Sequence, residues 1–419
     1  RFIKKCLLKC LKLRYHYNVS SRSNVAYLMK PDGSKHSNFS VPNSLDGSRQ
    51  LVKRILSAIT SESLSDVIIG LEATSVYGDN LVWFLREDGS LSSYNKRIHV
   101  LNPKQVNKFK QAYNDLPKND YVDSFVIADC LRFGRINKEV YLDDYRYKAL
   151  QNLTRARFFA VQNLVKEKQR FLNYLFKKYS TMAQEKVFSN TFSTSALAVY
   201  EEFDSAETLA DMDLQQLTEF LIQKGKNRFP DPESVAKAIQ KAARSSYRLP
   251  KTINDSVNQV LSISISSMKA LESQIKAFDK AIAAQMELIP NTLTSVNGIG
   301  PVYSAGIIAE IGDINRFPNQ AALAKHAGLV WSQHQSGDFE VQNTRLIKSG
   351  NRYLKYYLCE AAMSLVRCDA EYSRFYHLKY KEVNKYQHKR ALALTARKFV
   401  RLVFRLLKDN CLYRAPEAH

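Results

Sequence analysis

The sequence predicts three parts: an α/β domain at residues 11–140, a helical coiled-coil region at residues 141–290, and a mainly α-helical domain at residues 291–400 with a basic tail at 401–419. Three observations predict this division. Short β-type runs separated by turn residues alternate with helical patterns in the first third. Apolar residues recur at intervals of three and four in the middle. The last third combines glycine-interrupted helical patterns with an excess of basic residues.

The first third contains five runs with the composition of strands. Three consecutive antiparallel strands are predicted for "LRYHYNV", "NVAYLM" and "SNFSV". A helical pattern from Leu45 to Ile59 precedes the apolar run "DVIIGLE", which predicts a buried strand. A helix is then predicted for "YGDNLVWFLRE" and a strand for "RIHVLN". This order is typical of a layered domain with a mixed sheet.

Three carboxylates are candidates for a functional site because of their positions. Glu72 closes the buried run "DVIIGLE", and Asp120 and Asp123 begin the helical pattern "DYVDSFVIADCLRFG". The spacing of three residues places both aspartates on one helix face. An alternative stays open, because a glutamate can simply be the first solvated residue after a strand, and aspartates at a helix start stabilise its dipole.

The middle of the chain predicts two long helices. One runs from Leu150 to Leu175 and carries many basic residues, and a clear break follows at Pro230-Asp231-Pro232. The second carries a seam of apolar residues at Ile253, Val257, Leu261, Ile265, Met268, Leu271, Ile275, Phe278, Ile282 and Met286. Such a seam forms either a hairpin within the chain or a coiled coil between chains. We expect both, and hence a homo-oligomer (dimer or tetramer).

In the last third, Gly298-Ile299-Gly300-Pro301 interrupts an apolar helical run from Leu293 to Ala309, which predicts a helix-hairpin-helix-like motif. Its glycines permit a sharp turn and leave backbone N–H groups to meet a phosphate. A short helix is then predicted to end at Gly328 and lead into the loop Trp331–Gly337, which contains Ser336. Ser349 is a candidate cap for the next helix.

The charge of the chain indicates a polyanionic partner. Its formal net charge is +22 with a pI near 9.6, which favours nucleic acid. Residues 341–419 hold 17 Lys and Arg against 6 Asp and Glu, interleaved with tyrosines that can stack on unpaired bases. No apolar run is long enough to span a bilayer, so no membrane partner is expected. The segment "RFIKKCLLKCLKL" lacks a signal cleavage site, and the six cysteines show no zinc-type pairing. A cytoplasmic location is predicted.

Five short motifs occur in one order: "GIGP", "AEIGDINRF", "HAGL", "HQSG" and "KSGNRYLK". Together they resemble the C-terminal domain of transposases of the IS-one-hundred-ten class, also called the DEDD or pilin-invertase type. The resemblance implies a DNA recombinase of an insertion sequence. It also implies that Ser336, in the "SG" motif, is the nucleophile that forms a covalent link to DNA.

The N-terminal part resembles the same family's RuvC-like domain, which has an RNase H fold. The resemblance implies that Glu72, Asp120 and Asp123 are catalytic and bind Mg²⁺, a hard ion that prefers oxygen ligands. The family's first-strand aspartate is matched by Asn18, in "YHYNVS", which supplies an amide oxygen but no negative charge. The resemblance further implies a structured guide RNA as a partner.

Seven residues of the C-terminal part are candidates for nucleic-acid contacts: Gly298, Gly300, Arg345, Lys348, Asn351, Arg352 and Lys355. Two other functions stay open beside the serine recombinase. One is a RuvC-like nuclease or resolvase that cuts with metal-activated water, in which Ser336 has no role. The other is a non-catalytic nucleic-acid-binding remnant of a transposase, which the substitution at Asn18 favours.

Overall fold

A computed structural model describes residues 6–12, 22–73, 76–117, 119–134, 145–185, 187–226, 229–332, 335–336, 339–340 and 345–414. For residues 6–12, 335–336 and 339–340 it describes the backbone alone. The chain divides into two compact units, Arg1–Asp143 and Asp144–His419.

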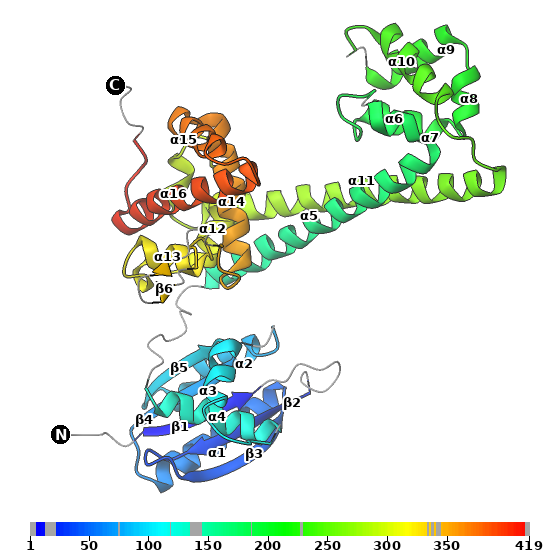
Figure 1. Ribbon diagram of the computed structural model, residues 1–419. Helices are drawn as coiled ribbons and strands as arrows, with labels where there is room; N and C mark the ends of the chain where they lie inside the picture. The colour runs from blue at the N-terminus through cyan, green and yellow to red at the C-terminus, as the bar shows by residue number, and fades with distance from the viewer. Residues whose placement is uncertain are drawn as a thin grey trace. The chain divides into compact units, whose positions relative to one another are not determined.

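The first unit contains a five-stranded mixed sheet in the order β3-β2-β1-β4-β5 (Figure 1). Its strands are β1 (Cys6–Lys12), β2 (Ser23–Met29), β3 (Lys35–Pro42), β4 (Asp66–Glu72) and β5 (Asn95–Leu101). β1 pairs antiparallel with β2 and parallel with β4, and β4 pairs parallel with β5. The predicted mixed sheet and α/β class of this unit are confirmed.

The helices of this unit cover both faces of the sheet. They are α1 (Leu45–Ser61), α2 (Asp79–Glu87), the 3₁₀ turn η1 (Gly89–Leu91), α3 (Pro103–Lys110) and α4 (Asp120–Arg132). Successive side chains of β4 lie on opposite faces of the sheet, so this strand contacts the helices on both faces. Val67, Ile69 and Leu71 pack with α1 and α2, whereas Ile68 packs with α3 and α4.

The first strand lies elsewhere than predicted. The first strand was predicted in "LRYHYNV", and no strand was predicted in the preceding segment "RFIKKCLLKCLKL", whereas β1 occupies Cys6–Lys12. This segment contains Lys9 and Lys12, yet β1 is the central strand of the sheet, paired on both sides. Asn18 and the rest of the predicted strand lie outside the described residues.

The second unit is built on a long helical hairpin of α5 (Tyr145–Lys178) and α11 (Lys251–Glu287) (Figure 1). The two helices are antiparallel, because ion pairs join Arg157 to Asp279 and Lys168 to Glu272. This confirms the hairpin predicted within one chain. The pairing of hairpins between chains stays a prediction.

The apolar seam of α11 divides into three sections. Val257, Leu261, Ile265 and Met268 are buried in a core with the small helices at one end of the hairpin. Ile282 and Met286 are buried in the core at the other end. Between these sections Leu271, Ile275 and Phe278 are only half-buried. Ile253, near the start of the helix and before the first section, is exposed. The seam therefore serves mainly the chain's own cores, except in its middle.

A small helical domain closes one end of the hairpin. It consists of α6 (Ser180–Glu185), α7 (Thr194–Glu202), α8 (Ala206–Asp211), α9 (Leu214–Gly225) and α10 (Pro232–Arg244). Four of these helices start with a serine or aspartate whose side chain accepts a backbone N–H three residues on, the usual way to satisfy an exposed helix start. The predicted break at Pro230-Asp231-Pro232 leads into α10, whose cap is Asp231 and whose first residue is Pro232.

The other end of the hairpin bears the helical domain that follows α11. Its elements are η2 (Leu293–Ser295), α12 (Pro301–Ile311), η3 (Ile314–Arg316), α13 (Gln320–His326), β6 (Gln335–Ser336), β7 (Phe339–Glu340), α14 (Arg352–Cys368), α15 (Ala370–Lys381) and α16 (Gln387–Asp409). α12 crosses α14 closely at Gly306, where a Cβ atom would lie 2.2 Å from the ring of Tyr357. The Tyr357 hydroxyl donates to the Thr154 carbonyl at 2.7 Å, which fixes this crossing against α5.

Three local predictions in this domain need correction. The segment before Gly298 forms only the 3₁₀ turn η2, so the predicted helix-hairpin-helix lacks a full first helix. The cap of α14 is Asn351 and not Ser349, because the Asn351 side chain accepts the N–H groups of Tyr353 and Leu354. Ser336 ends a two-residue strand instead of lying in an open loop.

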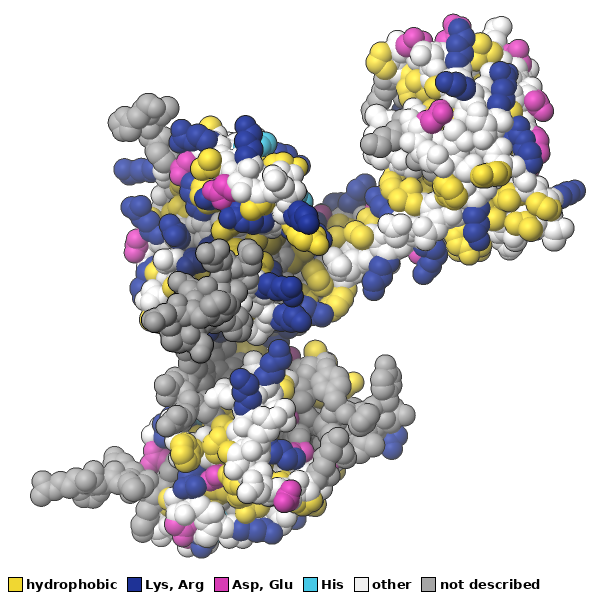
Figure 2. All heavy atoms as spheres, viewed as in Figure 1, with side chains coloured by type: hydrophobic (Ala, Val, Ile, Leu, Met, Phe, Trp, Pro, Cys, Tyr) yellow, Lys and Arg dark blue, Asp and Glu magenta, His cyan; other side chains and the backbone are white. Residues whose placement is uncertain are grey.

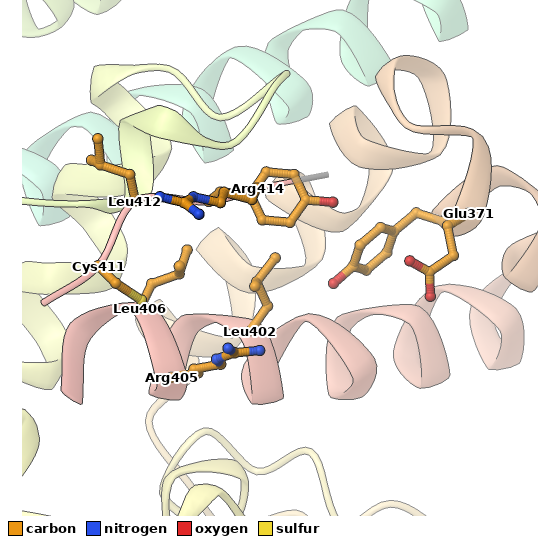
Figure 3. A pocket seen from close by; sticks show the side chains of 9 residues that line it. Glu371, Leu402, Arg405, Leu406, Cys411, Leu412 and Arg414 are labelled. Atoms are coloured by element: carbon orange, nitrogen blue, oxygen red, sulfur yellow. The ribbon is translucent and has the colours of Figure 1, made fainter. Parts of the chain in front are cut away.

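The chain after residue 400 is partly helical and packs on the domain. α16 continues to Asp409, so the expected tail boundary falls inside a helix. The segment that follows returns to the domain, where the Tyr413 N–H donates to Ser295 and the Tyr413 hydroxyl to Asp369. It covers one side of a cavity of about 590 Å³ whose lining includes Arg405 and Arg414 (Figure 3). Among the described residues, no helix is long and apolar enough to cross a membrane.

Candidate active site

The direction of α4 decides where its aspartates lie. The ring of Phe125 packs 5.6 Å from the ring of Tyr27, and Tyr27 is level with Gly70 of β4 through the register of β1. Further along α4, Arg132 lies against Gly33, in the turn after β2 at the amino end of β4. α4 therefore runs antiparallel to β4, and its start lies toward the carboxyl end of that strand.

This arrangement brings the three predicted carboxylates to one edge of the sheet. Glu72 is the last residue of β4, and Asp120 and Asp123 occupy the first turn of α4, which begins with the capping side chain of Asn119. Asp123 is buried, whereas Glu72 and Asp120 are half-buried. The carboxyl ends of parallel strands are a common place for ligand sites in α/β sheets.

Asp123 has a cationic partner that the sequence argument missed. The ammonium group of Lys110, at the end of α3, lies 2.7 Å from the Asp123 carboxylate, and both side chains are largely shielded from water. Asp123 is therefore not the solvated helix carboxylate of the alternative interpretation. The signal in the sequence was weak, because Lys110 is one of four lysines between Lys104 and Lys118.

The carboxylates suit a hard divalent ion in their chemistry, since all three offer oxygen and none offers sulfur or nitrogen. Within the residues that the structure describes, no three His, Cys, Asp or Glu side chains are close enough to form a metal site. Lys110 already neutralises one of the three carboxylates. Asp129, on the same helix, has a structural role, because it accepts hydrogen bonds from Arg132 and Tyr113.

Ser336 lies at the end of an antiparallel extension of the second unit. At its base the Ser332 N–H donates to Arg345 at 2.8 Å and the Ile347 N–H donates to Val330 at 3.0 Å. Further out, β6 pairs with β7, with Ser336 opposite Phe339. We call the described residues between Leu329 and Ser349 the serine hairpin. Ser336 is thus the last residue of β6 and pairs with the first residue of β7.

Two glycines hold the ends of the serine hairpin together. Gly328 and Gly350 both have positive φ, +71° and +129°, and a Cβ on Gly350 would lie 2.6 Å from the Gly328 Cα. The contact is therefore backbone against backbone, and any side chain at either position would separate the two ends. The Asn351 N–H donates to the His326 carbonyl at 2.7 Å and closes the base.

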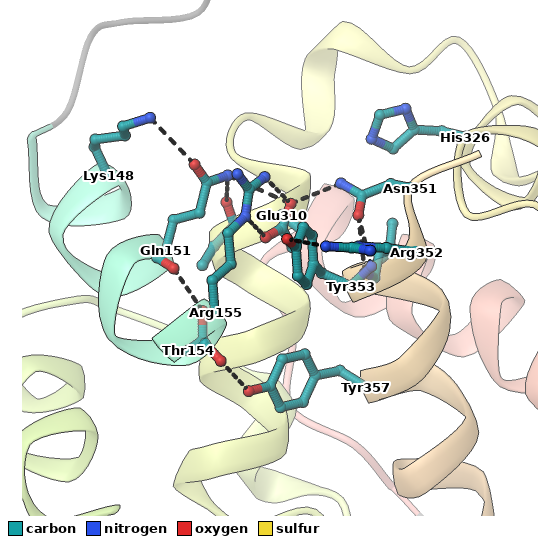
Figure 4. Close-up of polar contacts among 12 residues, drawn as sticks. Lys148, Gln151, Thr154, Arg155, Glu310, His326, Asn351, Arg352, Tyr353 and Tyr357 are labelled. Atoms are coloured by element: carbon teal, nitrogen blue, oxygen red, sulfur yellow. Dashed lines mark hydrogen bonds and ion pairs between the residues drawn. The ribbon is translucent and has the colours of Figure 1, made fainter. Parts of the chain in front are cut away.

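The base of the serine hairpin is anchored to a buried carboxylate, Glu310 of α12 (Figure 4). Its side chain is 1% exposed and pairs with Arg155 of α5 through two hydrogen bonds of 2.7 and 2.9 Å. The Asn351 amide donates to the same carboxylate at 2.6 Å. Asn351 therefore caps α14 and ties it to α12 at once. Glu310 lies in the motif "AEIGDINRF" but was not among the predicted site residues.

The other candidate nucleic-acid residues differ in their surroundings. Gly298 is packed against Cys368 of α14, whereas Gly300 is exposed with open space beside it. Lys348 and Arg345 are exposed at the base of the serine hairpin. The Arg352 guanidinium lies 4.8 Å from the Tyr353 ring centre and 5.5 Å from that of Phe159. Lys and Arg side chains lie at many separate places on the visible face of the helical domain that follows α11 (Figure 2).

Comparisons with known proteins agree with this layout. Residues 18–179 match a family model described as "Transposase", and residues 291–377 match one described as "Transposase IS116/IS110/IS902 family". The chain belongs to this transposase family. An IS116 insertion-element protein of Streptomyces clavuligerus is 26% identical over 334 residues, 77% of this chain and 79% of that protein. A probable family 20 transposase of Pseudomonas aeruginosa is 30% identical over 105 residues, 25% of this chain and 31% of that protein.

The two matched segments of this transposase cover its two candidate centres. The first includes Glu72, Asp120 and Asp123 and begins at Asn18. The second includes Glu310, Ser336 and Asn351. Membership in the family implies DNA transposition as the activity. The second match ends at residue 377, so the turn from α15 into α16 lies beyond it.

Proposed function

We propose that this transposase cuts and joins DNA through Ser336, assisted by the carboxylates Glu72, Asp120 and Asp123. The observation that carries the proposal is the construction of the serine hairpin. A buried ion pair, a helix cap and a glycine contact all fix its base. A catalytic group needs such rigid support, because small displacements reduce the rate strongly.

The proposed reaction conserves the number of phosphodiester bonds. The Ser336 Oγ attacks a DNA phosphorus atom and loses its proton, and the bond to one deoxyribose oxygen breaks as that oxygen takes up a proton. A phosphoserine link and a free DNA hydroxyl result. Attack by the hydroxyl of another strand reverses the step and rejoins DNA. A serine hydroxyl is a weak nucleophile, so a base nearby has to accept its proton.

The N-terminal unit is proposed to have an RNase H-like (RuvC-like) fold. The strand order β3-β2-β1-β4-β5, with β2 antiparallel to β1, supports this assignment, as does the position of the carboxylates at the end of β4. Glu72, Asp120 and Asp123 are not close enough together in this structure to form a metal site, so they would have to move closer to hold Mg²⁺. The bound ion would supply charge stabilisation for a phosphate. Asn18 would provide an uncharged oxygen at most.

Nucleic acid is the proposed partner throughout, as element-end and target DNA and as a structured guide RNA. The net charge of +22 supports both. Pairing of hairpins between chains is also proposed, because Leu271, Ile275 and Phe278 remain half-buried in the single chain.

A second candidate is a nucleic-acid-binding remnant without catalysis. The Lys110–Asp123 ion pair favours it, since the lysine supplies the charge compensation that a metal ion would otherwise give. Asp123→Asn distinguishes the two. An active enzyme loses Mg²⁺-dependent cleavage in this variant, whereas a remnant shows no cleavage in any form and changes only in thermal stability.

The serine proposal is tested by incubating the full chain with labelled element-end DNA and separating the products on a denaturing gel. We expect covalent protein–DNA adducts from the wild type and from Ser349→Ala, an exposed serine of the same hairpin. Ser336→Ala should form none while it binds DNA normally. Adducts in Ser336→Ala would assign the nucleophile elsewhere, and DNA cleavage without adducts would favour the metal-activated water mechanism.

A further inference from the structure

A cavity of about 740 Å³ lies at the base of the serine hairpin. Trp331 and Leu346, which form an antiparallel bridge across that base, line one side. The turn from α15 into α16, including Lys385 and Tyr386, lines the other. Its volume falls in the range of roughly 300–1,000 Å³ typical of small-ligand sites.

The cavity is cationic. Its carboxylate, Glu382, is already neutralised by Lys379 and by Arg390 at 2.8 Å, and the hydrogen bonds from these two groups lower the pKa of Glu382. Lys385 and Lys389, which also line the cavity, have no carboxylate partner among the described residues. The surplus of positive charge suits a phosphate group.

The aromatic side chain of Tyr386 is not explained by stability. Tyr386 is 79% exposed and has a left-handed backbone with φ +54°, a conformation that costs energy for a residue with a large side chain. It occupies the cap position of α16 without capping it, where Ser, Thr, Asn or Asp would be favoured. Its ring is therefore available to an outside partner.

We propose that this cavity holds an unpaired nucleotide of the DNA strand that Ser336 attacks. An exposed tyrosine ring and the half-buried indole of Trp331 offer flat surfaces to a base, and the lysines offer charge to the adjoining phosphate. A base inside a duplex has no free face for such stacking. The site thus selects single-stranded over double-stranded DNA.

The position of the cavity identifies the strand. Trp331 precedes Ser336 by five residues, which span at most about 18 Å when fully extended. A nucleotide in the cavity therefore lies within a few nucleotides of the phosphate that Ser336 reaches. The choice of this DNA strand rests on the proposed role of Ser336. Binding of an unpaired nucleotide in the cavity can be measured without cleavage.

The test uses Tyr386→Gly in the full chain, because glycine accepts the left-handed backbone and removes only the ring. Tyr386→Phe keeps the ring, and Tyr247→Gly removes a similarly exposed tyrosine (77%) from the small domain at the other end of the hairpin. Binding is measured with single-stranded DNA that contains 2-aminopurine, whose fluorescence falls on stacking, and with duplex DNA and single-stranded RNA of the same sequence.

We expect Tyr386→Gly to weaken binding of single-stranded DNA roughly 5- to 150-fold, the loss typical of one base–aromatic stack, and to abolish part of the quenching. Duplex binding should change less than about two-fold, and Tyr386→Phe and Tyr247→Gly should resemble the wild type. Equal loss for single strand and duplex, or no loss, would overturn the proposal. Loss confined to RNA would assign the cavity to a guide RNA instead. If Ser336→Ala forms adducts while the binding results for the Tyr386 variants are as expected, the serine mechanism is refuted but the nucleotide site is not.

Discussion

Replacement of Glu310 by alanine should destabilise the second unit strongly. The Glu310 carboxylate is 1% exposed and accepts hydrogen bonds from Arg155, Gln151 and Asn351. Removal of one member of a buried ion pair costs about 3–5 kcal/mol. Arg155 is 37% exposed, so it can turn partly to water in the variant. We therefore expect the lower end, about 3 kcal/mol.

The effect is measured by thermal unfolding of the full chain. A loss of about 3 kcal/mol lowers the Tm of a large domain by roughly 6–12 °C. Glu310→Gln keeps the volume and one acceptor oxygen, so its Tm should lie between those of the alanine variant and the wild type. Glu272→Ala is the matched control, since Glu272 pairs with Lys168 at 3.3 Å but is 48% exposed. Its Tm should hardly change.

The same variants test the link to the serine hairpin. Asn351 loses its acceptor in Glu310→Ala but can keep one in Glu310→Gln. In the alanine variant adduct formation should therefore fall more than DNA binding does, even below the unfolding temperature. A Tm of Glu310→Ala within about 2 °C of the wild type would refute the energetic argument. If Glu310→Ala loses the expected stability but still forms adducts normally, the Glu310 contacts do not position Ser336.

Three further outcomes are expected. Gly328→Ala should lower the Tm and adduct formation, because its Cβ would lie 2.7 Å from the Ser349 carbonyl at φ +71°, whereas Gly300→Ala, with open space, should not lower the Tm much. Phe278→Ser should separate chains in light scattering without unfolding them, and Met268→Ser should unfold the small helical domain in which Met268 is buried. Burial lowers the pKa of Lys178 to about 8 from 10.5. Between these two pH values the unfolded chain binds more protons than the folded chain, so the charged lysine destabilises the fold most at low pH. Lys178→Met should therefore raise the free energy of unfolding most below pH 8 and progressively less toward pH 10.5, as measured by denaturant unfolding.

The sequence was informative wherever periodicity and local chemistry act within one element. The start of α4 at Asp120, the end of α13 before Gly328 and the hairpin of α5 and α11 follow from such signals. The cap of α14 was wrong by two residues, because Ser349 and Asn351 are both good caps and the choice depends on the Glu310 contact.

Contacts between segments that are far apart in the sequence could not be predicted from it. Lys110 and Asp123 belong to different helices, and Arg155 and Glu310 are 155 residues apart. A usable signal did exist for Glu310, since a lone glutamate inside the apolar run "SAGIIAEIG" has to be buried, and a buried carboxylate needs a cationic partner. The sequence could thus have predicted that a partner exists, although not which arginine it is.

The order of motifs in the C-terminal domain has a common physical explanation. "AEIG" supplies Glu310, "HAGL" supplies Gly328, and "SGN" supplies Gly350 and Asn351; all of them meet at the base of the serine hairpin and none lies on its outer part. Since Arg155 completes the anchor from α5, the base is fixed to the long helical hairpin as well as to α12. A displacement of α5 is therefore transmitted to Asn351 through two hydrogen-bonded carboxylate contacts, which makes the orientation of the serine hairpin dependent on the long helical hairpin.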